Sequence, residues 1–317
     1  MKKKHLNTFI IIILLIILYE LFDHSNIINN TIINSSKIWF YNIIPSLFPI
    51  YIIIDLLINY DILSYLNFIL KPISKLFKIN INSSIIFILS LLSGFPSNSK
   101  YINTYLDNNS ISLIDANKLL MFTHFSNPLF IINSIGKNFL HNKIIGLIIL
   151  FSHYITNIFI GLINRNYLSN ININYYYKNK KNSFMTTLTN SIYNTIKILF
   201  LLYGIITVFM IIINIINVNL NLNPLIKSII SGLLEITTGI YYSSNLNINI
   251  IYKSCLITFF LSFGGLSIHM QVFGILNKYK LNYFNYFKTR IIHAIISSSI
   301  VFIILQLKNA FLFAEIF

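Results

Sequence analysis

The chain has 317 residues, of which 56% are hydrophobic, 15% aromatic and only 10% charged, and its mean hydropathy is +0.72. A soluble protein usually carries roughly a quarter of its residues as Asp, Glu, Lys or Arg. So little charge cannot cover a globule in water, which excludes an ordinary soluble enzyme or binding domain. We expect an all-α polytopic membrane protein, because helices satisfy their own backbone polar groups inside a bilayer.

The net charge of +15 comes mainly from Lys and Arg at the ends of apolar segments, where such residues set topology and meet anionic lipid. We therefore expect a lipid environment and no nucleic acid. A single cysteine, Cys255, excludes a disulfide framework and a cysteine-built zinc site. No nucleotide, metalloprotease or serine-hydrolase motif occurs. We expect no enzymatic activity, no catalytic residue, no metal and no cofactor.

The N-terminus has the order of a signal sequence. Three lysines and His5 precede an apolar stretch from Leu6 to about Phe22, and no small-x-small cleavage site follows. This order predicts an uncleaved signal anchor with its N-terminus in the cytoplasm. Residues 1–36 would then form the anchor helix and an outer loop.

Four further spans are expected in chain order, at about 37–59, 144–164, 195–216 and 290–307. Basic residues between them predict which loops are cytoplasmic. These are Lys71, Lys75, Lys78, Arg165, Lys178, Lys180, Lys181, Lys278, Lys280, Lys288 and Arg290. The uncharged stretch 217–223 is expected outside, as is a C-terminal tail at 309–317.

Two regions, 83–136 and 224–275, do not fit simple spans. Each begins with a short apolar piece that is broken by small and polar residues before it reaches the roughly 20 residues that a span needs. Irregular backbone at membrane depth is tolerated only where protein or a water-filled cavity satisfies it. We predict a re-entrant broken-helix hairpin in each region.

The same two regions suggest an internal repeat. Ser93-Gly94 and Ser231-Gly232 are 138 residues apart, and so are Phe125 and Phe263. The first region follows a basic loop and the second an uncharged loop, so the copies would run in opposite senses across the bilayer. We expect inverted repeats at 37–165 and 191–308, joined by a cytoplasmic basic loop at 166–190. This is the build of many secondary transporters, whose sites lie near the midplane.

Two of the charged residues in these regions are functional candidates. Lys100 follows a run of short polar side chains, where it could meet a carboxylate or phosphate, or it could be an interfacial lysine that snorkels. Glu235 lies in an apolar piece, where a carboxylate is costly and therefore suggests proton or cation coupling, or fixing of the opposite hairpin. The alternative for Glu235 is a charge at a hairpin tip that reaches water.

Other polar residues interrupt the apolar runs. The breaks at 126–128 and 264–267 would free backbone groups for a ligand, or would mark packing kinks. His269 and Gln271 could bond a substrate or be satisfied interior residues. We expect His124, His153 and His293 to be structural, and Asp55 has no assigned role. The candidate substrate-binding set is Gly94, Pro96, Ser97, Asn98, Ser99, Lys100, Ser126, Asn127, Pro128, Gly232, Glu235, Thr237, Thr238, Gly264, Gly265, Ser267, His269 and Gln271.

The combined motifs resemble a known family. They are Ser93-Gly94-Phe95-Pro96 with Lys100, Asn127-Pro128-Leu129-Phe130, Gly232-Leu233-Leu234-Glu235-Ile236-Thr237, Phe263-Gly264-Gly265-Leu266-Ser267-Ile268-His269, and Ile44-Pro45-Ser46-Leu47-Phe48-Pro49 after Ile38-Trp39. This set, spread over about 37–300, resembles the sporulation integral membrane proteins of the YlbJ/SpoVV type, which belong with the nucleoside-recognition or gate-domain proteins. Asn98, Asn127 and Thr238 depart from the residues usual in that family.

The resemblance implies secondary or facilitated transport of dipicolinic acid, a small aromatic dicarboxylate, from the mother cell towards the forespore. It implies a site between the inverted repeats and a place in the outer forespore membrane. Two alternatives stay open. One is a membrane scaffold for a spore-envelope complex, and the other is a transporter of nucleosides or another metabolite. A homo-oligomer or other sporulation membrane proteins are the expected protein partners.

Overall fold

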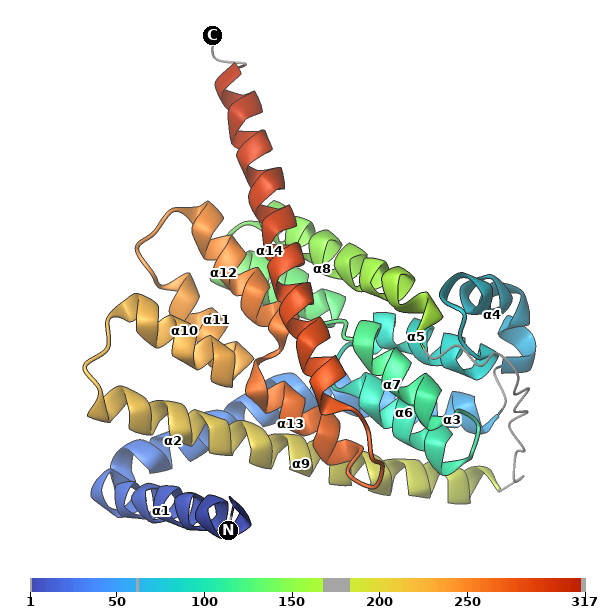
Figure 1. Cartoon of the computed structure of the whole chain (residues 1–317), viewed down its shortest axis with the longest axis horizontal. Coiled ribbons are helices and arrows are strands. Elements are labelled where there is room, and N and C mark those ends of the chain that lie inside the picture. The colour runs from blue at the N-terminus through green and yellow to red at the C-terminus, as the bar shows by residue number, and fades with distance from the viewer. Residues whose placement is uncertain (1, 61–62, 168–182, 315–317) are drawn as a thin grey trace.

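The computed structural model describes residues 2–60, 63–167 and 183–314, and all regular structure in these ranges is helical (Figure 1). The expected all-α fold is confirmed to that extent. Three lysines on which the predicted topology depends, Lys178, Lys180 and Lys181, lie outside the described residues.

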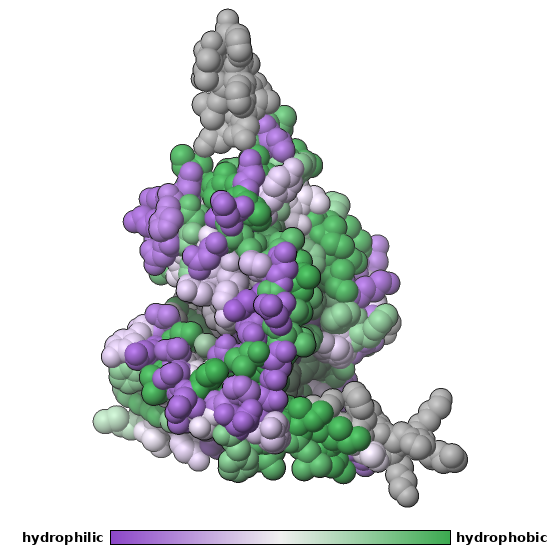
Figure 2. All heavy atoms as spheres, turned by 90° about the vertical axis from the view of Figure 1, so that its left-hand side faces the viewer, coloured by the Kyte–Doolittle hydropathy of each residue, from purple (hydrophilic) through white to green (hydrophobic). Residues whose placement is uncertain are grey.

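Among the residues that the structure describes, four helical segments are long and apolar enough to cross a membrane. They are Lys143–Asn166, which contains α8 (Lys143–Ile163), α9 (Phe184–Asn219), Ile250–Ile275, and Tyr283–Leu307 within α14 (Tyr283–Ala314). Two bent helix pairs would raise the number to six if each is one span. Figure 2 shows broad areas of hydrophobic side chains on one face. These features agree with a multi-pass membrane protein, because lipid tails rather than water then meet the exposed apolar side chains.

Helix α1 (Lys2–Asp23) is followed at once by α2 (Ser25–Ile38). Most of the residues that were predicted to form an outer loop are therefore helical. The sequence 25–36 is rich in Asn and Ser and does not read as a span by itself. It packs antiparallel to α9, where its polar side chains find partners. Ser35 Oγ lies 2.8 Å from Thr207 Oγ1, and Asn214 Nδ2 donates to Thr31 Oγ1 at 2.6 Å.

The helical segment after α1 thus runs through α2, the short π-helix Trp39–Ile43 and α3 (Ile44–Asn59). It starts earlier than the predicted span, which began at residue 37. Its direction along α9 is the one expected, because residues near 35 lie beside Thr207 and residues near 51 lie beside Thr195.

Several loops that were predicted to be cytoplasmic meet at one end of the molecule. Helices α4 (Leu63–Phe77) and α7 (Leu113–Phe122) contribute to this end. Lys118 Nζ donates to the carbonyl oxygens of Lys78 and Arg165 at 2.8 and 2.5 Å, and Lys78 Nζ donates to Asn166 Oδ1 at 2.7 Å. Asn282 N donates to Asn117 Oδ1 at 2.7 Å, which brings the loop before α14 to the same end.

Breaks in the helices fall inside both of the regions that did not fit simple spans. In the first region, α5 (Ile81–Ser93) and α6 (Ser97–Asp107) are separated at 94–96, and α7 and the π-helix Phe130–Phe139 at 123–129. In the second, α10 (Pro224–Leu234) meets α11 (Ile236–Ser244) at Glu235, and α12 (Ile250–Phe263) meets α13 (Gly265–Ile275) at Gly264.

Each hairpin tip packs against the later break of its own half. Phe95 N donates to Phe125 O at 2.6 Å, and the Gly94 backbone lies against that of Asn127. In the other half, the Gly265 backbone lies against those of Gly232 and Ile236. Gly94 with Asn127 and Gly232 with Gly265 have the 138-residue offset that the sequence suggested. The inverted orientation of the halves and the re-entrant course of the hairpins stay predictions.

Candidate functional site

A polar cleft of about 470 Å³ opens between α3, α6, α9 and the end of α13. Amides, hydroxyls and charged groups dominate its wall, which includes Asp55, Asn59, Lys100, Asn103, Thr104, Asp107, Asn190, Ser191, Asn194, Lys197 and Lys278. Three lysines and two aspartates give this wall a net positive charge. A polar, net-cationic cleft beside the apolar helices α3 and α9 is a candidate solute path, because polar groups within membrane-spanning segments usually line such paths.

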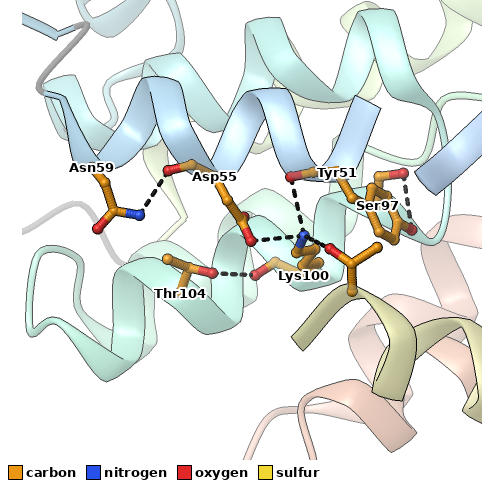
Figure 3. A network of polar contacts seen from close by, with 7 residues as sticks. Tyr51, Asp55, Asn59, Ser97, Lys100 and Thr104 are labelled. Atoms are coloured by element: carbon orange, nitrogen blue, oxygen red, sulfur yellow. Dashed lines mark hydrogen bonds and ion pairs between the residues drawn. The ribbon is translucent and has the colours of Figure 1, made fainter. Parts of the chain in front are cut away.

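The cleft contains a buried ion pair. Lys100 Nζ lies 3.0 Å from Asp55 Oδ2, and the two residues are 3% and 7% exposed. The same Nζ donates to Thr195 Oγ1 at 3.2 Å and Tyr51 O at 3.3 Å, and stands 4.4 Å from the centre of the Tyr51 ring (Figure 3). An ammonium has three donors, and all three are used. An arriving carboxylate must therefore replace one of the present partners.

Helical spacing places the α3 side of this network. Tyr51, Asp55 and Asn59 are four residues apart and share one face of α3, and Asn59 Nδ2 donates to Asp55 O at 2.7 Å. The facing helix α6 contributes Lys100 and Ser97, whose Oγ donates to Tyr51 OH at 3.1 Å. Lys100 thus points into the protein rather than snorkelling. Asp55 had no assigned role because its partner lies 45 residues further along the chain.

The outer part of the cleft carries a second carboxylate, Asp107. Lys278 Nζ lies 3.6 Å from Asp107 Oδ1, and the Tyr279 hydroxyl donates to the same oxygen at 2.7 Å. Burial, followed by the hydrogen bond and negative charge of Asp107, raises the pKa of Tyr279 to about 12. This hydroxyl stays protonated at neutral pH, so it remains a donor that holds Asp107 in place.

Of the residues predicted to bind substrate, only Lys100 lines the cleft. The others lie at the two hairpin tips, at the two breaks and along α13. Asn98 Nδ2 donates to Thr123 Oγ1 at 3.3 Å, and Ser99 Oγ donates to Pro96 O at 2.6 Å. The first turn of α6 is therefore tied to its own tip and to the first break.

Glu235 is a helix cap. It is 1% exposed, so it does not reach water at the hairpin tip. Its carboxylate accepts four hydrogen bonds from Thr237 and Thr238, two from backbone N–H groups at 3.1 and 2.8 Å and two from hydroxyls at 2.6 and 2.8 Å. These donors stand at the N-terminus of α11, where negative charge is stabilised. The structure does not bring Glu235 into the cleft with Lys100.

Histidines connect the two breaks. His153 Nε2 accepts from Ser126 N at 3.0 Å, and its Nδ1 lies 2.9 Å from Ser262 Oγ. Gly264 has a φ of +89°, and a methyl group there would lie 2.8 Å from His124 Nε2. Glycine is needed at this position both for its backbone conformation and for the approach of His124. The break at 123–129 in the first half thus contacts the break at Gly264 in the second half.

His269 and Gln271 differ in their surroundings. His269 uses both ring nitrogens, with Tyr283 OH at 3.2 Å and Phe263 O at 3.0 Å. This geometry favours the interior structural role for His269. Gln271 Nε2 and Ser267 Oγ are buried and have no hydrogen-bond partner among the described residues.

Arg290 lies in a helix and not in the loop that its neighbouring basic residues predict. Its position in a basic run predicted a cytoplasmic loop, but α14 begins at Tyr283 and the Arg290 side chain is completely buried. It donates to Met121 O at 2.5 Å, His293 Nδ1 at 3.0 Å and Asn157 Oδ1 at 3.4 Å. Arg290, His293 and Ser297 follow helical spacing, and this polar stripe on an apolar helix was the signal in the sequence.

Comparisons with known proteins test whether this chain resembles a known family. No protein-family model and no solved structure matches the chain. A curated relative, the sporulation integral membrane protein YlbJ of Bacillus subtilis (strain 168), is 24% identical over 310 residues, which cover 86% of this chain and 76% of the relative. This similarity supports a YlbJ-type family assignment. The resemblance carried by the motifs is thereby confirmed, and the relative's description as an integral membrane protein agrees with the apolar spans of this YlbJ-type chain.

Proposed function

We propose that this YlbJ-type protein is a sporulation membrane transporter that moves dipicolinate from the mother cell towards the forespore, in the outer forespore membrane. The observation that carries the proposal is the net-cationic cleft of about 470 Å³ that reaches the buried Lys100–Asp55 pair between α3 and α6. The curated relative's name supports the sporulation context. A small aromatic dicarboxylate suits a cleft of this charge and of a size typical of small-molecule sites.

Binding in the cleft would be an exchange of partners. Lys100 now holds Asp55, and a substrate carboxylate could replace Asp55 while the ammonium stays neutralised throughout. Such an exchange keeps the buried ammonium paired, and the displaced Asp55 carboxylate must bind a proton or turn into the open cleft, because an unpaired buried charge is costly. The Tyr51 ring, 4.4 Å from Lys100 Nζ, offers an aromatic surface beside the carboxylate site. Asp55 then keeps the cationic site closed when substrate is absent.

Passage beyond the cleft requires a change at the two breaks. The hairpin tips and breaks pack backbone against backbone within each half, and His124 joins the first break to Gly264 in the second half. Movement of one half against the other would separate this contact. Alternating exposure of a site between two halves is how many secondary transporters work.

Reconstitution separates the proposal from its alternatives. Liposomes that contain the purified full chain should take up labelled dipicolinate, and unlabelled dipicolinate should compete while uridine should not. Lys100→Gln should slow uptake at equal protein content, whereas Lys253→Gln should not, because Lys253 does not line the cleft and its Nζ donates to Ser244 O. No uptake of either solute would favour a scaffold, and uptake of uridine alone would favour a nucleoside transporter. Either result would overturn the proposal.

A further inference from the structure

Arg290 is a buried cation without a counterion. It lies two turns inside α14, with no exposed surface. Its hydrogen-bond acceptors are a carbonyl oxygen, an amide oxygen and an imidazole nitrogen, none of which carries a charge. Among residues 2–60, 63–167 and 183–314, no carboxylate forms an ion pair with it. A buried charge that is hydrogen-bonded but not neutralised is costly, so its presence needs a reason.

The histidines around Arg290 do not carry the opposite charge, and their partners show that two of them are neutral. His293 Nδ1 accepts from Arg290, and its Nε2 donates to His153 O at 2.9 Å. His153 Nε2 accepts from Ser126 N, so its Nδ1 is the protonated nitrogen and donates to Ser262 Oγ. Each of these rings has one donor and one acceptor, which is the neutral form. His153 and His293 are therefore neutral, and the positive charge in this cluster belongs to Arg290 alone.

Two polar atoms in this cluster lack partners. Arg290 Nε and His124 Nε2 are buried and have no hydrogen-bond partner in the part of the chain that the structure describes. Both side chains lie beside Tyr286: the Arg290 guanidinium carbon is 5.5 Å from its ring centre, and the His124 ring centre is 5.9 Å away. Tyr286 OH lies 3.2 Å from His124 Nδ1. If this buried hydroxyl donates, as such groups usually do, His124 Nε2 carries a proton with no acceptor.

We propose that Arg290 and His124 form a carboxylate-binding site at the junction of the two breaks. Arg290 supplies the positive charge and a planar donor group that matches a carboxylate, and His124 Nε2 supplies a further donor beside Gly264. Aromatic rings surround the site, since Phe95 stacks on His124 at 4.4 Å and Tyr286 lies 4.9 Å from His269. A carboxylate attached to an aromatic ring fits this combination.

The Arg290 site would be a second binding site for the transported anion, in addition to the one at Lys100. Lys100 is already neutralised by Asp55, whereas Arg290 gains its first counterion when a carboxylate arrives. Only the identity of the ligand as dipicolinate rests on the proposed function; the carboxylate chemistry rests on Arg290 and His124. The closed contact between His124 and Gly264 would have to open before the ligand enters.

A metal site does not explain the histidines. In the described ranges, no three His, Cys, Asp or Glu side chains are grouped so that they could hold a metal ion. A purely structural network is the remaining alternative, and ligand binding separates it from an anion site.

The test measures binding of dipicolinate, acetate and chloride, each alone, to the purified full chain in lipid nanodiscs by titration calorimetry. The wild-type protein should bind dipicolinate, and Arg290→Gln should weaken this binding by about tenfold or more, the effect expected when a charged hydrogen bond is lost. Lys100→Gln is measured in parallel, so that the cleft and the junction are assessed separately.

A second variant keeps the test decisive if Arg290→Gln folds poorly. Asn157 Oδ1 accepts from Arg290, so Asn157→Asp places a carboxylate on the guanidinium with almost no change of shape. This internal counterion should occupy the site and weaken dipicolinate binding by about tenfold or more. Asn157→Ala is the matched control, because it removes the same amide, including the bond from Nδ2 to His124 O at 2.6 Å, without adding a charge.

The outcomes are distinct. Weakened binding in Arg290→Gln and Asn157→Asp, with near wild-type binding in folded Asn157→Ala, supports the site. Unchanged dipicolinate affinity in Arg290→Gln or Asn157→Asp overturns it while leaving the proposed transport of dipicolinate intact. Binding of acetate or chloride but not dipicolinate by the wild-type chain, if it is lost in Arg290→Gln, supports an anion site at Arg290 and contradicts the proposed substrate. Wild-type protein that binds none of the three anions overturns the site.

Discussion

Two buried cations in this protein have opposite surroundings. Lys100 lines a cleft between α3, α6 and α9, and its ammonium is neutralised by Asp55 at 3.0 Å. Arg290 lies at the junction of the two helix breaks and is bonded only to neutral acceptors. Removing one partner of a buried ion pair is strongly destabilising, whereas a buried charge that already lacks a partner is costly and suggests a ligand.

The two sites also differ in the kind of buried polar atom that lacks a hydrogen-bond partner. In the cleft, the atoms without a hydrogen-bond partner among the described residues are acceptors, Asp55 Oδ1 and Asn103 Oδ1. At the junction, Arg290 Nε is a donor without one. The cleft in its present form is already supplied with negative charge and the junction is not. The comparison therefore predicts that the two cations respond differently when their surroundings are changed.

The largest effect is expected at the Lys100–Asp55 pair. Asp55→Asn leaves a buried ammonium without its counterion and should destabilise the protein by about 3–5 kcal/mol. Unfolding of the purified chain in detergent measures this loss. The double variant Asp55→Asn with Lys100→Met should recover most of it, since no buried charge remains. A loss below about 1 kcal/mol in Asp55→Asn would show that the pair is not buried as described.

The next effect concerns the contact that closes the junction. Gly264→Ala should cost about 2–3 kcal/mol, because alanine at a φ of +89° is strained and its methyl group meets His124 Nε2. Gly204→Ala is the matched control. A methyl group at Gly204 has no neighbour within 4 Å in helix α9, so this change should stabilise the protein by about 0.5–1 kcal/mol. Equal effects at the two glycines would contradict the close approach of the two breaks.

Removing the charge of Arg290 should destabilise the protein less than removing the charge of Asp55. Arg290→Gln loses bonds to neutral acceptors but also removes a charge that no carboxylate balances, so we expect a cost of about 1–2 kcal/mol. Lys288→Gln, at an exposed position two residues earlier on α14, should change stability by less than about 0.5 kcal/mol. If Arg290→Gln were as damaging as Asp55→Asn, Arg290 would have a structural counterion after all.

Glu235 gives the smallest expected effect and is a third case, a buried carboxylate held by backbone N–H groups and by hydroxyls. Asn is as good a helix cap as a carboxylate, so Glu235→Asn should change stability by no more than about 1 kcal/mol and should preserve dipicolinate uptake. Glu235→Ala, which cannot cap, should cost about 1–2 kcal/mol. A stable Glu235→Asn protein without uptake would instead identify Glu235 as a coupling carboxylate.

Much of the fold could be predicted from composition and charge, since apolar stretches at 144–164 and 195–216 coincide with spanning helices. The breaks were predicted from small and polar residues such as Gly264. Helix α2 was missed because its polar side chains are satisfied by α9, a partner that local sequence does not reveal. The same limit applies to Asp55 and Arg290, whose roles depend on helices distant in sequence.

Within the candidate site, the sequence left open whether Lys100 binds an anion or snorkels, and it did not indicate that Asp55 would neutralise this lysine. Arg290 was assigned to a loop because a run of basic residues near a span usually marks the cytoplasmic side. Its spacing with His293 and Ser297 would have indicated a polar helix face. Charge counting finds loops well, whereas helical periodicity is needed to find a buried cation close to a loop.

The most direct test of the account is the initial rate of dipicolinate uptake by liposomes that contain equal amounts of wild-type, Asn157→Asp or Asn157→Ala protein. We predict measurable uptake by the wild type and by Asn157→Ala. The uptake rate of Asn157→Asp should be lower by a factor of about ten or more, because its internal carboxylate neutralises Arg290. Equal rates in wild type and Asn157→Asp, or no uptake by the wild type, would contradict passage of a carboxylate past an unpaired Arg290.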